Sequence, residues 1–275
     1  MHFISFALVA ALFGAPDPGE SASILPPPDG VTSLPWDSLV VDDCKARLEK
    51  AGYSGKEFRF STWNYIRTIK RRGADPLRCH VPQPIVMMKS PSGMSYNGYT
   101  FVNCSMALAM VRFEEIAQEE ARRIWDKPDD SFPVQAMAHM GTYNCRTLRF
   151  KTKQSQHSFG NGLDIAVFRI AGAGEVNVTH HWTARWPALQ KKEDFLRSLA
   201  RRLRQEAVFT NVLDPDSDHG HWNHIHVDLA PLSDGEPSPA LARLRATEVG
   251  PQGKFWDHRF PMSERSVVQG SGVLR

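Results

Sequence analysis

Apolar residues recur every three or four positions along residues 104–125, a spacing that predicts a long amphipathic helix. The apolar positions of this helix are Met106, Met110, Phe113, Ile116, Ala117, Ala121 and Ile124. A second stretch of the same kind predicts a helix over residues 194–209, with Asp194 as its N-terminal cap. Its apolar positions are Phe195, Leu199, Leu203 and Ala207. A shorter helical pattern lies near residues 39–48.

Short apolar segments, several of which alternate with polar residues, predict β-strands in the rest of the chain. The predicted strands cover residues 134–139, 148–151, 163–170, 175–178 and 223–229. Helices that flank a group of short strands are typical of an α+β fold, so we expect a small, mostly antiparallel sheet between the helices.

The two ends of the chain have a different character from its middle. Residues 3–13 form an apolar run that is too short to cross a bilayer and has the length of a signal-peptide core, which predicts a signal peptide over residues 1–15. A Pro-rich linker follows over residues 16–35. Residues 36–232 then form one domain, and residues 233–275 are predicted to be a polar tail. No other apolar run is long enough for a stable membrane span.

Composition adds two constraints. The 275 residues are 41% hydrophobic and 23% charged, a balance typical of a globular protein with one sizeable core. The 33 basic and 30 acidic residues are spread along the chain, so no concentrated positive surface for nucleic acid is expected. The oligomeric state does not follow from the sequence.

The four cysteines are an even number at wide spacing, with no Cys-x-x-Cys pair that would indicate a zinc ribbon. Two disulfides in an oxidising compartment are the expected arrangement, which makes the protein periplasmic or secreted. Order along the chain suggests the pairs Cys44–Cys79 and Cys104–Cys145, although three pairings are formally open. Free buried thiols are the alternative.

One candidate site lies in residues 155–165, where a glycine-containing turn leads into an apolar strand. Asp164 points away from its apolar neighbours in that strand, and the turn is long enough to return His157 to the same cavity. A histidine nitrogen and a carboxylate oxygen are both suitable zinc ligands. A hydrogen-bonded His–Asp pair without metal is the alternative interpretation.

A second candidate site is residues 219–226, which contain four of the eleven histidines. If residues 224–229 form a strand, His224, His226 and Asp228 share one face, and two imidazoles enter the same cavity. One can complete a three-ligand zinc site with a fourth position for water, and the other can act on that water. The alternatives are a surface loop or a site that stores metal without chemistry.

The combined pattern, Ser-x-His-x-x-Gly-x-x-x-Asp followed by a late His-x-His, resembles a known group of zinc metallopeptidases. This superfamily includes lysostaphin, the D-alanyl-D-alanine peptidases and the hedgehog signalling domain. Within it, residues 36–231 resemble the extensin-like C-terminal domain family. The resemblance rests on Cys104, Tyr143-Asn144-Cys145-Arg146, residues 155–165, Trp182, Phe195-Leu196-Arg197, Leu213-Asp214-Pro215 and residues 221–228.

The resemblance implies one zinc ion held by His157, Asp164 and His226. It also implies that His224 and His221 flank the water at the metal, and it leaves open which of the two is the general base. By the same resemblance Arg146 steadies a substrate carbonyl or carboxylate. A structural ion pair is the alternative role for this arginine.

Three positions depart from the usual pattern of the family. Gln156 stands where glutamate is usual, and Gly162 stands where alanine is common. Ala207-Val208 occupy the place of a frequent Ala-Cys pair, so this chain lacks one cysteine that relatives often have and its disulfide pairing can differ from theirs.

With this resemblance, the sequence predicts a zinc-dependent peptidase that hydrolyses peptide cross-links or stem peptides of bacterial peptidoglycan, as murein DD-endopeptidases and DD-carboxypeptidases do. The rival is a non-catalytic, zinc-containing module that binds peptidoglycan, because a fold alone does not determine function. The presence of both accessory histidines beside a full ligand set favours the enzyme.

Overall fold

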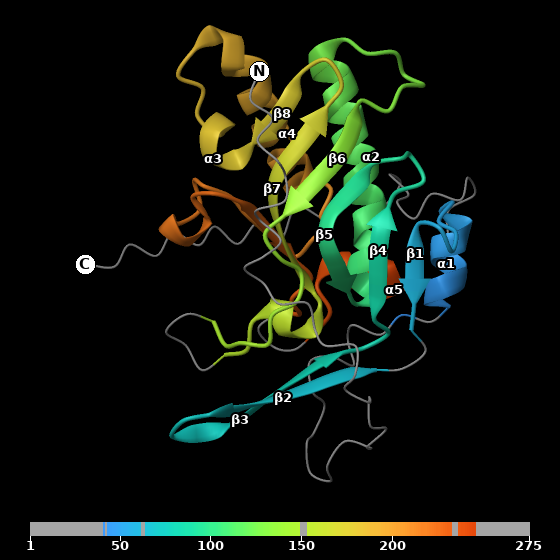
Figure 1. The fold of residues 1–275 in the computed structure, drawn as a ribbon, viewed down its shortest axis with the longest axis vertical. Coiled ribbons are helices and arrows are strands. Elements are labelled where there is room, and N and C mark those ends of the chain that lie inside the picture. Colours follow the sequence, from blue (N-terminus) through green and yellow to red (C-terminus); the bar gives the residue numbers. More distant parts are fainter. Residues whose placement is uncertain (1–40, 42, 62–63, 149–152, 233–235, 246–275) are drawn as a thin grey trace.

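A single large β-sheet forms the centre of the protein. The computed structural model describes residues 41, 43–61, 64–148, 153–232 and 236–245. Eight strands form the sheet in the order β1-β4-β5-β6-β7-β10-β9, with β8 paired to β7 (Figure 1). They are β1 (Phe58–Phe60), β4 (Ile85–Lys89), β5 (Ser95–Val102), β6 (Val134–His139), β7 (Gly162–Ile170), β8 (Gly174–Asn177), β9 (Asn211–Leu213) and β10 (Ile225–Asp228). The β5–β6 pair is parallel and the other pairs of this sheet are antiparallel. The α+β class is therefore confirmed, but the sheet is mixed and larger than expected.

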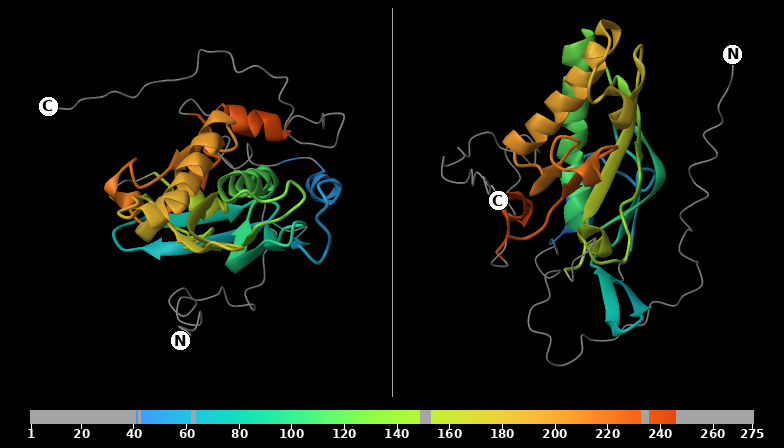
Figure 2. Two further views of the ribbon diagram at one scale, coloured as in Figure 1. Left: turned by 90° about the horizontal axis from the view of Figure 1, so that it is seen from above. Right: turned by 90° about the vertical axis from the view of Figure 1, so that its left-hand side faces the viewer.

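Helices cover one face of this sheet. Figure 2 shows α2 (Cys104–Trp125), α4 (Gln190–Gln205) and α5 (Pro239–Arg245) on the same side. The remaining helical elements are α1 (Cys44–Lys50), α3 (Val178–His181), η4 (Gln156–Phe159), η5 (Pro187–Leu189) and η6 (His219–His221). A separate hairpin of β2 (Tyr65–Arg71) and β3 (Ala74–Val81) extends beyond the end of the sheet. Within the described residues, no helix is both long and apolar enough to cross a membrane.

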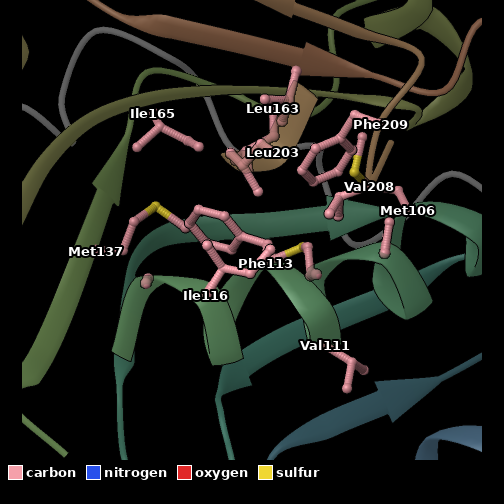
Figure 3. Packing of buried hydrophobic residues seen from close by; sticks show 14 of the residues in the cluster. Met106, Val111, Phe113, Ile116, Met137, Leu163, Ile165, Leu203, Val208 and Phe209 are labelled. Atoms are coloured by element: carbon pink, nitrogen blue, oxygen red, sulfur yellow. The ribbon is translucent and has the colours of Figure 1, made fainter. Parts of the chain in front are cut away.

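The core lies between α2 and the sheet. Phe113 and Ile116 of α2 are fully buried and pack toward Met137 of β6 and Ile165 of β7 (Figure 3). Along β7 the even-numbered residue Asp164 stands between two fully buried apolar residues, so its side chain points to the face turned away from α2. The fold therefore leaves this second face of β7 available for polar chemistry.

Two helix predictions need correction. α4 begins four residues before the predicted start, so Asp194 lies inside the helix and accepts a hydrogen bond from Gln190 Nε2 (3.0 Å) instead of capping the N-terminus. The helix ends before Ala207, whose left-handed φ of 46° is incompatible with its continuation. The segment predicted as a polar tail contains α5, with Ala240 and Leu241 fully buried against the core.

Other sequence predictions agree with the structure to different degrees. The helix over 104–125 and the strand over 134–139 have the predicted bounds. The last strand is shorter than predicted, because β10 begins at Ile225 and His224 precedes it. Residue 148 lies outside any strand, and residues 149–151, like residues 1–35, fall outside the described residues.

The structure contains the expected two disulfides but pairs the cysteines differently. Cys44 bonds to Cys104, and Cys79 bonds to Cys145, so the predicted pairs were wrong. The reason is topological: α1 packs on α2, and β3 packs beside the η4 turn, whereas chain order carries no information about either contact. Two disulfides are typical of an oxidising compartment outside the cytoplasm.

We predict that removal of the Cys79–Cys145 bridge by the double substitution Cys79→Ser and Cys145→Ser lowers the free energy of unfolding by about 2–4 kcal/mol. The bridge closes a long loop, with a sequence separation of 66 residues, and so restricts the unfolded chain. Urea denaturation of wild type and variant measures the change. Non-reducing peptide mapping that recovered Cys44 joined to Cys79 would contradict the pairing.

Candidate metal centre

A locked turn fixes the position of His157. The residue lies in η4, which ends at Gly160 with a φ of 58°. A Cβ at this glycine would lie 2.8 Å from Val81 Cγ1, so only glycine fits here without a shift of its surroundings. Asn103, which caps α2, also donates hydrogen bonds from Nδ2 to the Phe159 carbonyl (3.2 Å) and to Asn161 Oδ1 (3.1 Å). The turn is thereby attached to the N-terminus of α2.

Strand register brings the other two predicted ligands together. β7 and β10 are antiparallel, and His226 stands directly opposite Asp164. Side chains of directly opposed residues point to the same face of the sheet, with Cβ atoms about 4.5–5.5 Å apart. Both neighbours of His226 in β10 are fully buried, so its ring lies on the same outward face as the Asp164 carboxylate.

The three side chains place one potential ligand atom each within a small volume. His157 Nε2 lies 3.3 Å from His226 Nδ1 and 3.2 Å from Asp164 Oδ1, and His226 Nδ1 lies 2.8 Å from Asp164 Oδ1. These ligand atoms all lie within 4.8 Å of one another. Two ligands of tetrahedral zinc at about 2.0–2.1 Å are roughly 3.3 Å apart, so two of the three separations already match. The donor set fits a zinc ion.

In each histidine of the cluster, the ring nitrogen that points away from the potential metal position has a hydrogen-bond partner, as is usual for ligand histidines. His157 Nδ1 lies 3.2 Å from the Thr142 carbonyl oxygen, and His226 Nε2 lies 2.9 Å from Asp228 Oδ2. Asp228 is itself held, since its Oδ1 accepts hydrogen bonds from Asn211 Nδ2 (2.8 Å) and the Ala230 amide (2.9 Å). Partners of this kind fix the tautomer and the orientation of ligand histidines.

The charges of the cluster stabilise each other. Burial on its own would raise the pKa of Asp164, but hydrogen bonds from His157 and His226 hold that pKa well below its usual range. Burial likewise opposes the charged form of His226, yet hydrogen bonds to Asp164 and Asp228 raise its pKa to about 9. A metal ion must displace this proton, so zinc affinity is expected to increase with pH.

Two further histidines, His224 and His221, border the cluster. His224 Nε2 lies 3.5 Å from Asp164 Oδ1, and burial lowers the pKa of His224, so its ring is neutral at neutral pH. The ring of His221 lies 5.1 Å from that of His224 and 5.7 Å from that of His226, measured between centroids. Asp218 Oδ1 lies 2.7 Å from His221 Nδ1, which leaves Nε2 as the nitrogen for chemistry.

Arg146 is placed differently from the other predicted site residues. Its amide donates to Ser158 Oγ (3.0 Å) and its carbonyl accepts from the Ser155 amide (3.0 Å), which holds its backbone against the η4 turn. The guanidinium is exposed and donates to the Thr147 carbonyl (3.4 Å). Within the described residues it forms no ion pair, so the structural ion pair considered from the sequence is not observed.

Sequence reasoning missed two residues of this region. One of them is Asp218, which orients His221. Its position three residues before that histidine was the only hint of this role in the sequence. The other is His139 at the end of β6, whose Nε2 forms a hydrogen bond with Thr100 Oγ1 (2.9 Å). Burial lowers the pKa of His139 to about 4. Nothing in the strand pattern of β6 distinguished His139 from an ordinary strand end.

Gly162 has a local reason in this chain. A Cβ at this position would lie 3.2 Å from three atoms of the His157 ring, which is tighter than ordinary contact. An alanine would therefore require the ring to move by a few tenths of an ångström. The glycine allows His157 to pack directly on the start of β7.

Comparisons with known proteins give one match. The family model described as Extensin-like protein C-terminus matches residues 44–236, which is more than half of the chain. Neither the curated proteins nor the solved structures gave a match. The matched residues include all four cysteines and the His157–Asp164–His226 cluster.

Proposed function

The chain belongs to the extensin-like protein C-terminus family, and on this premise we propose that it is a zinc-dependent peptidase. Its proposed substrates are the peptide cross-links or stem peptides of bacterial peptidoglycan. We assign it to the superfamily of lysostaphin, the D-alanyl-D-alanine peptidases and the hedgehog domain, and to the periplasm or the secreted proteins. The two disulfides support a location outside the cytoplasm.

One observation carries the proposal: three potential ligands and two further histidines converge on one face of β7 and β10. His157, Asp164 and His226 would hold the metal. A closed structural zinc site uses four protein ligands, whereas a catalytic site has three and keeps one position for water or substrate. The cluster of three therefore favours catalysis over a purely structural role.

The chemistry divides between the metal and the protein. When bound, zinc supplies Lewis acidity, which polarises a carbonyl oxygen and makes water nucleophilic near neutral pH. His224 is neutral and stands beside Asp164, so it can accept a proton from the attacking water. His221, oriented by Asp218, can deliver a proton from Nε2 to the leaving amine nitrogen when its ring is doubly protonated, and the proton taken up by His224 is then released to solvent as His221 is reprotonated. The two histidines can also act in the opposite order.

Arg146 completes the proposed site from its edge. Its backbone is attached to the turn that carries His157, and its exposed guanidinium is free to meet a substrate that reaches this turn. A guanidinium binds carboxylates in a bidentate manner, and the stem peptides of peptidoglycan present such groups. We assign Arg146 to substrate binding and to stabilisation of the oxyanion that forms during attack.

Incubation of the purified chain with cross-linked muropeptides tests the proposal. We expect amide cleavage that a chelator abolishes and that added zinc restores, with the products identified by mass spectrometry. A zinc-loaded protein that binds peptidoglycan and cleaves no muropeptide would instead establish the non-catalytic binding module.

A further inference from the structure

A pocket of about 550 Å³ lies beside the histidine-rich segment and has no part in the proposed mechanism. Its walls come from α3, the loop after α3, the loop after β9 and the residue after η6. Residues that line it include Thr179, Trp182, Arg185, Trp186, Asp216 and Trp222. This volume is within the range of sites that bind small molecules.

Two of the tryptophans in this pocket are exposed to an unusual degree. Trp186 is 69% exposed and Trp222 is 54% exposed. Tryptophan is highly buried on average, and exposed aromatic rings gathered at one pocket mark a binding surface. Each ring offers a flat apolar face, while Thr179, Asp216 and Arg185 offer hydrogen-bonding groups around it.

The polar wall of the pocket is held in place by an ion-pair network. Arg197 Nη1 donates to Asp216 Oδ2 (2.6 Å), and Arg197 Nε donates to Glu193 Oε1 (2.6 Å). The Arg197 guanidinium also stacks 4.8 Å from the ring centroid of Trp182. The other carboxylate oxygen of Glu193 accepts a hydrogen bond from the Ala184 amide (2.6 Å). This bond fixes the loop that leads to Trp186. A wall fixed in this way is pre-organised for a ligand.

The pocket and the metal centre share one segment of chain. Trp222 directly follows His221, and Thr179 Oγ1 donates to the carbonyl of Asn223 (3.5 Å). A ligand that occupies both places must combine a group for stacking on indole with a peptide for the metal centre. A saccharide that carries a peptide has both parts.

We propose that this pocket is a saccharide subsite that binds an N-acetylated hexosamine ring of the glycan strand. One face of such a ring carries C–H groups that pack on Trp186, the more exposed of the two indoles, while its hydroxyl and acetamido groups meet Asp216, Arg185 and Thr179. A proline-rich peptide would also stack on the indoles but has no hydroxyl groups with which to form hydrogen bonds to these polar side chains. The inference deepens the proposed function and rests on it for the peptide attached to the sugar.

Titration of the metal-free full-length chain with the tetramer of N-acetylglucosamine, followed by calorimetry, tests binding independently of hydrolysis. Trp186→Ala is expected to weaken binding about tenfold, the scale of one lost aromatic stacking contact. Trp186→Phe keeps a flat ring and is expected to retain most of the affinity. Phe132→Ala removes an aromatic residue that is 57% exposed outside the pocket, and serves as the control that leaves binding unchanged. Absence of tetramer binding by wild type, or equal binding by Trp186→Ala, would overturn the inference, as would preferential binding of a polyproline peptide.

Kinetics separate this inference from the proposed function. Trp186→Ala is expected to raise KM about tenfold for a glycan-linked muropeptide, with kcat unchanged and with no effect on the free stem peptide. Zinc-dependent hydrolysis with identical KM values for both proteins on both substrates would remove the subsite and keep the peptidase. Saccharide binding that depends on Trp186, in a chain that hydrolyses nothing, would keep the subsite and remove the peptidase.

Discussion

The substitutions His157→Ala, Asp164→Ala and His226→Ala are each expected to abolish stoichiometric zinc binding. Each removes one of three ligand atoms that lie within 4.8 Å of one another, and a site with three protein ligands has no replacement among them. The expected loss of affinity exceeds the roughly 10–100-fold typical of changes to outer partners of a metal site. Metal analysis after gel filtration, together with competition against a chelator, measures it.

His219→Ala provides a matched control for these variants. His219 belongs to the same histidine-rich segment but is exposed, and the ligand cluster does not include it. The control protein is expected to hold one zinc per chain. Asp228→Asn, which removes the negative charge beside His226 Nε2 and leaves all three ligands in place, is expected to bind zinc about 10–100-fold more weakly. Full zinc occupancy in all three ligand variants would show that the metal is held elsewhere.

The second large effect concerns the two histidines that are not ligands. We expect His224→Ala and His221→Ala to retain zinc and to hydrolyse cross-linked muropeptides at least ~100-fold more slowly, the usual scale for a proton-transfer residue. His224 Nε2 lies 3.5 Å from the Asp164 carboxylate, and His221 is oriented by Asp218. Both are therefore positioned beside the metal and can transfer protons there.

Zinc content and hydrolysis rate must be measured on the same preparations of these two variants, with His219→Ala as the control. Loss of zinc together with activity would mean that the histidine helps to hold the metal. Full activity in both variants would leave the peptidase intact but would remove the assigned acid and base.

The regular parts of the fold could be predicted because their patterns are strong. α2 has apolar residues at helical spacing along its whole length, and β6 and β7 are apolar on the face toward the core. The region of residues 58–102 carries five strands that the patterns did not predict. Two of them, β2 and β3, form a two-stranded hairpin that covers little of the core, so their sequences do not need an apolar face. β2 is mostly polar, and β3 contains Pro76, which argues against a strand.

The candidate site was predictable to a similar extent. The resemblance to the family implied His157, Asp164 and His226 as ligands, and the structure brings these three together. Their proximity depends on the register between β7 and β10, which only the fold determines. The same holds for the cysteines, because the contact between α1 and α2 decides the Cys44–Cys104 pair.

Titration of zinc into the metal-free protein, with cleavage of a cross-linked muropeptide followed at each step, tests the central proposal most directly. If His157, Asp164 and His226 form a catalytic zinc site, the rate should rise in proportion to bound zinc and level off at one equivalent. The His226→Ala protein should remain inactive over the same range. No cleavage at full zinc occupancy, or a rate that does not depend on zinc, would contradict the proposal that this chain is a zinc peptidase.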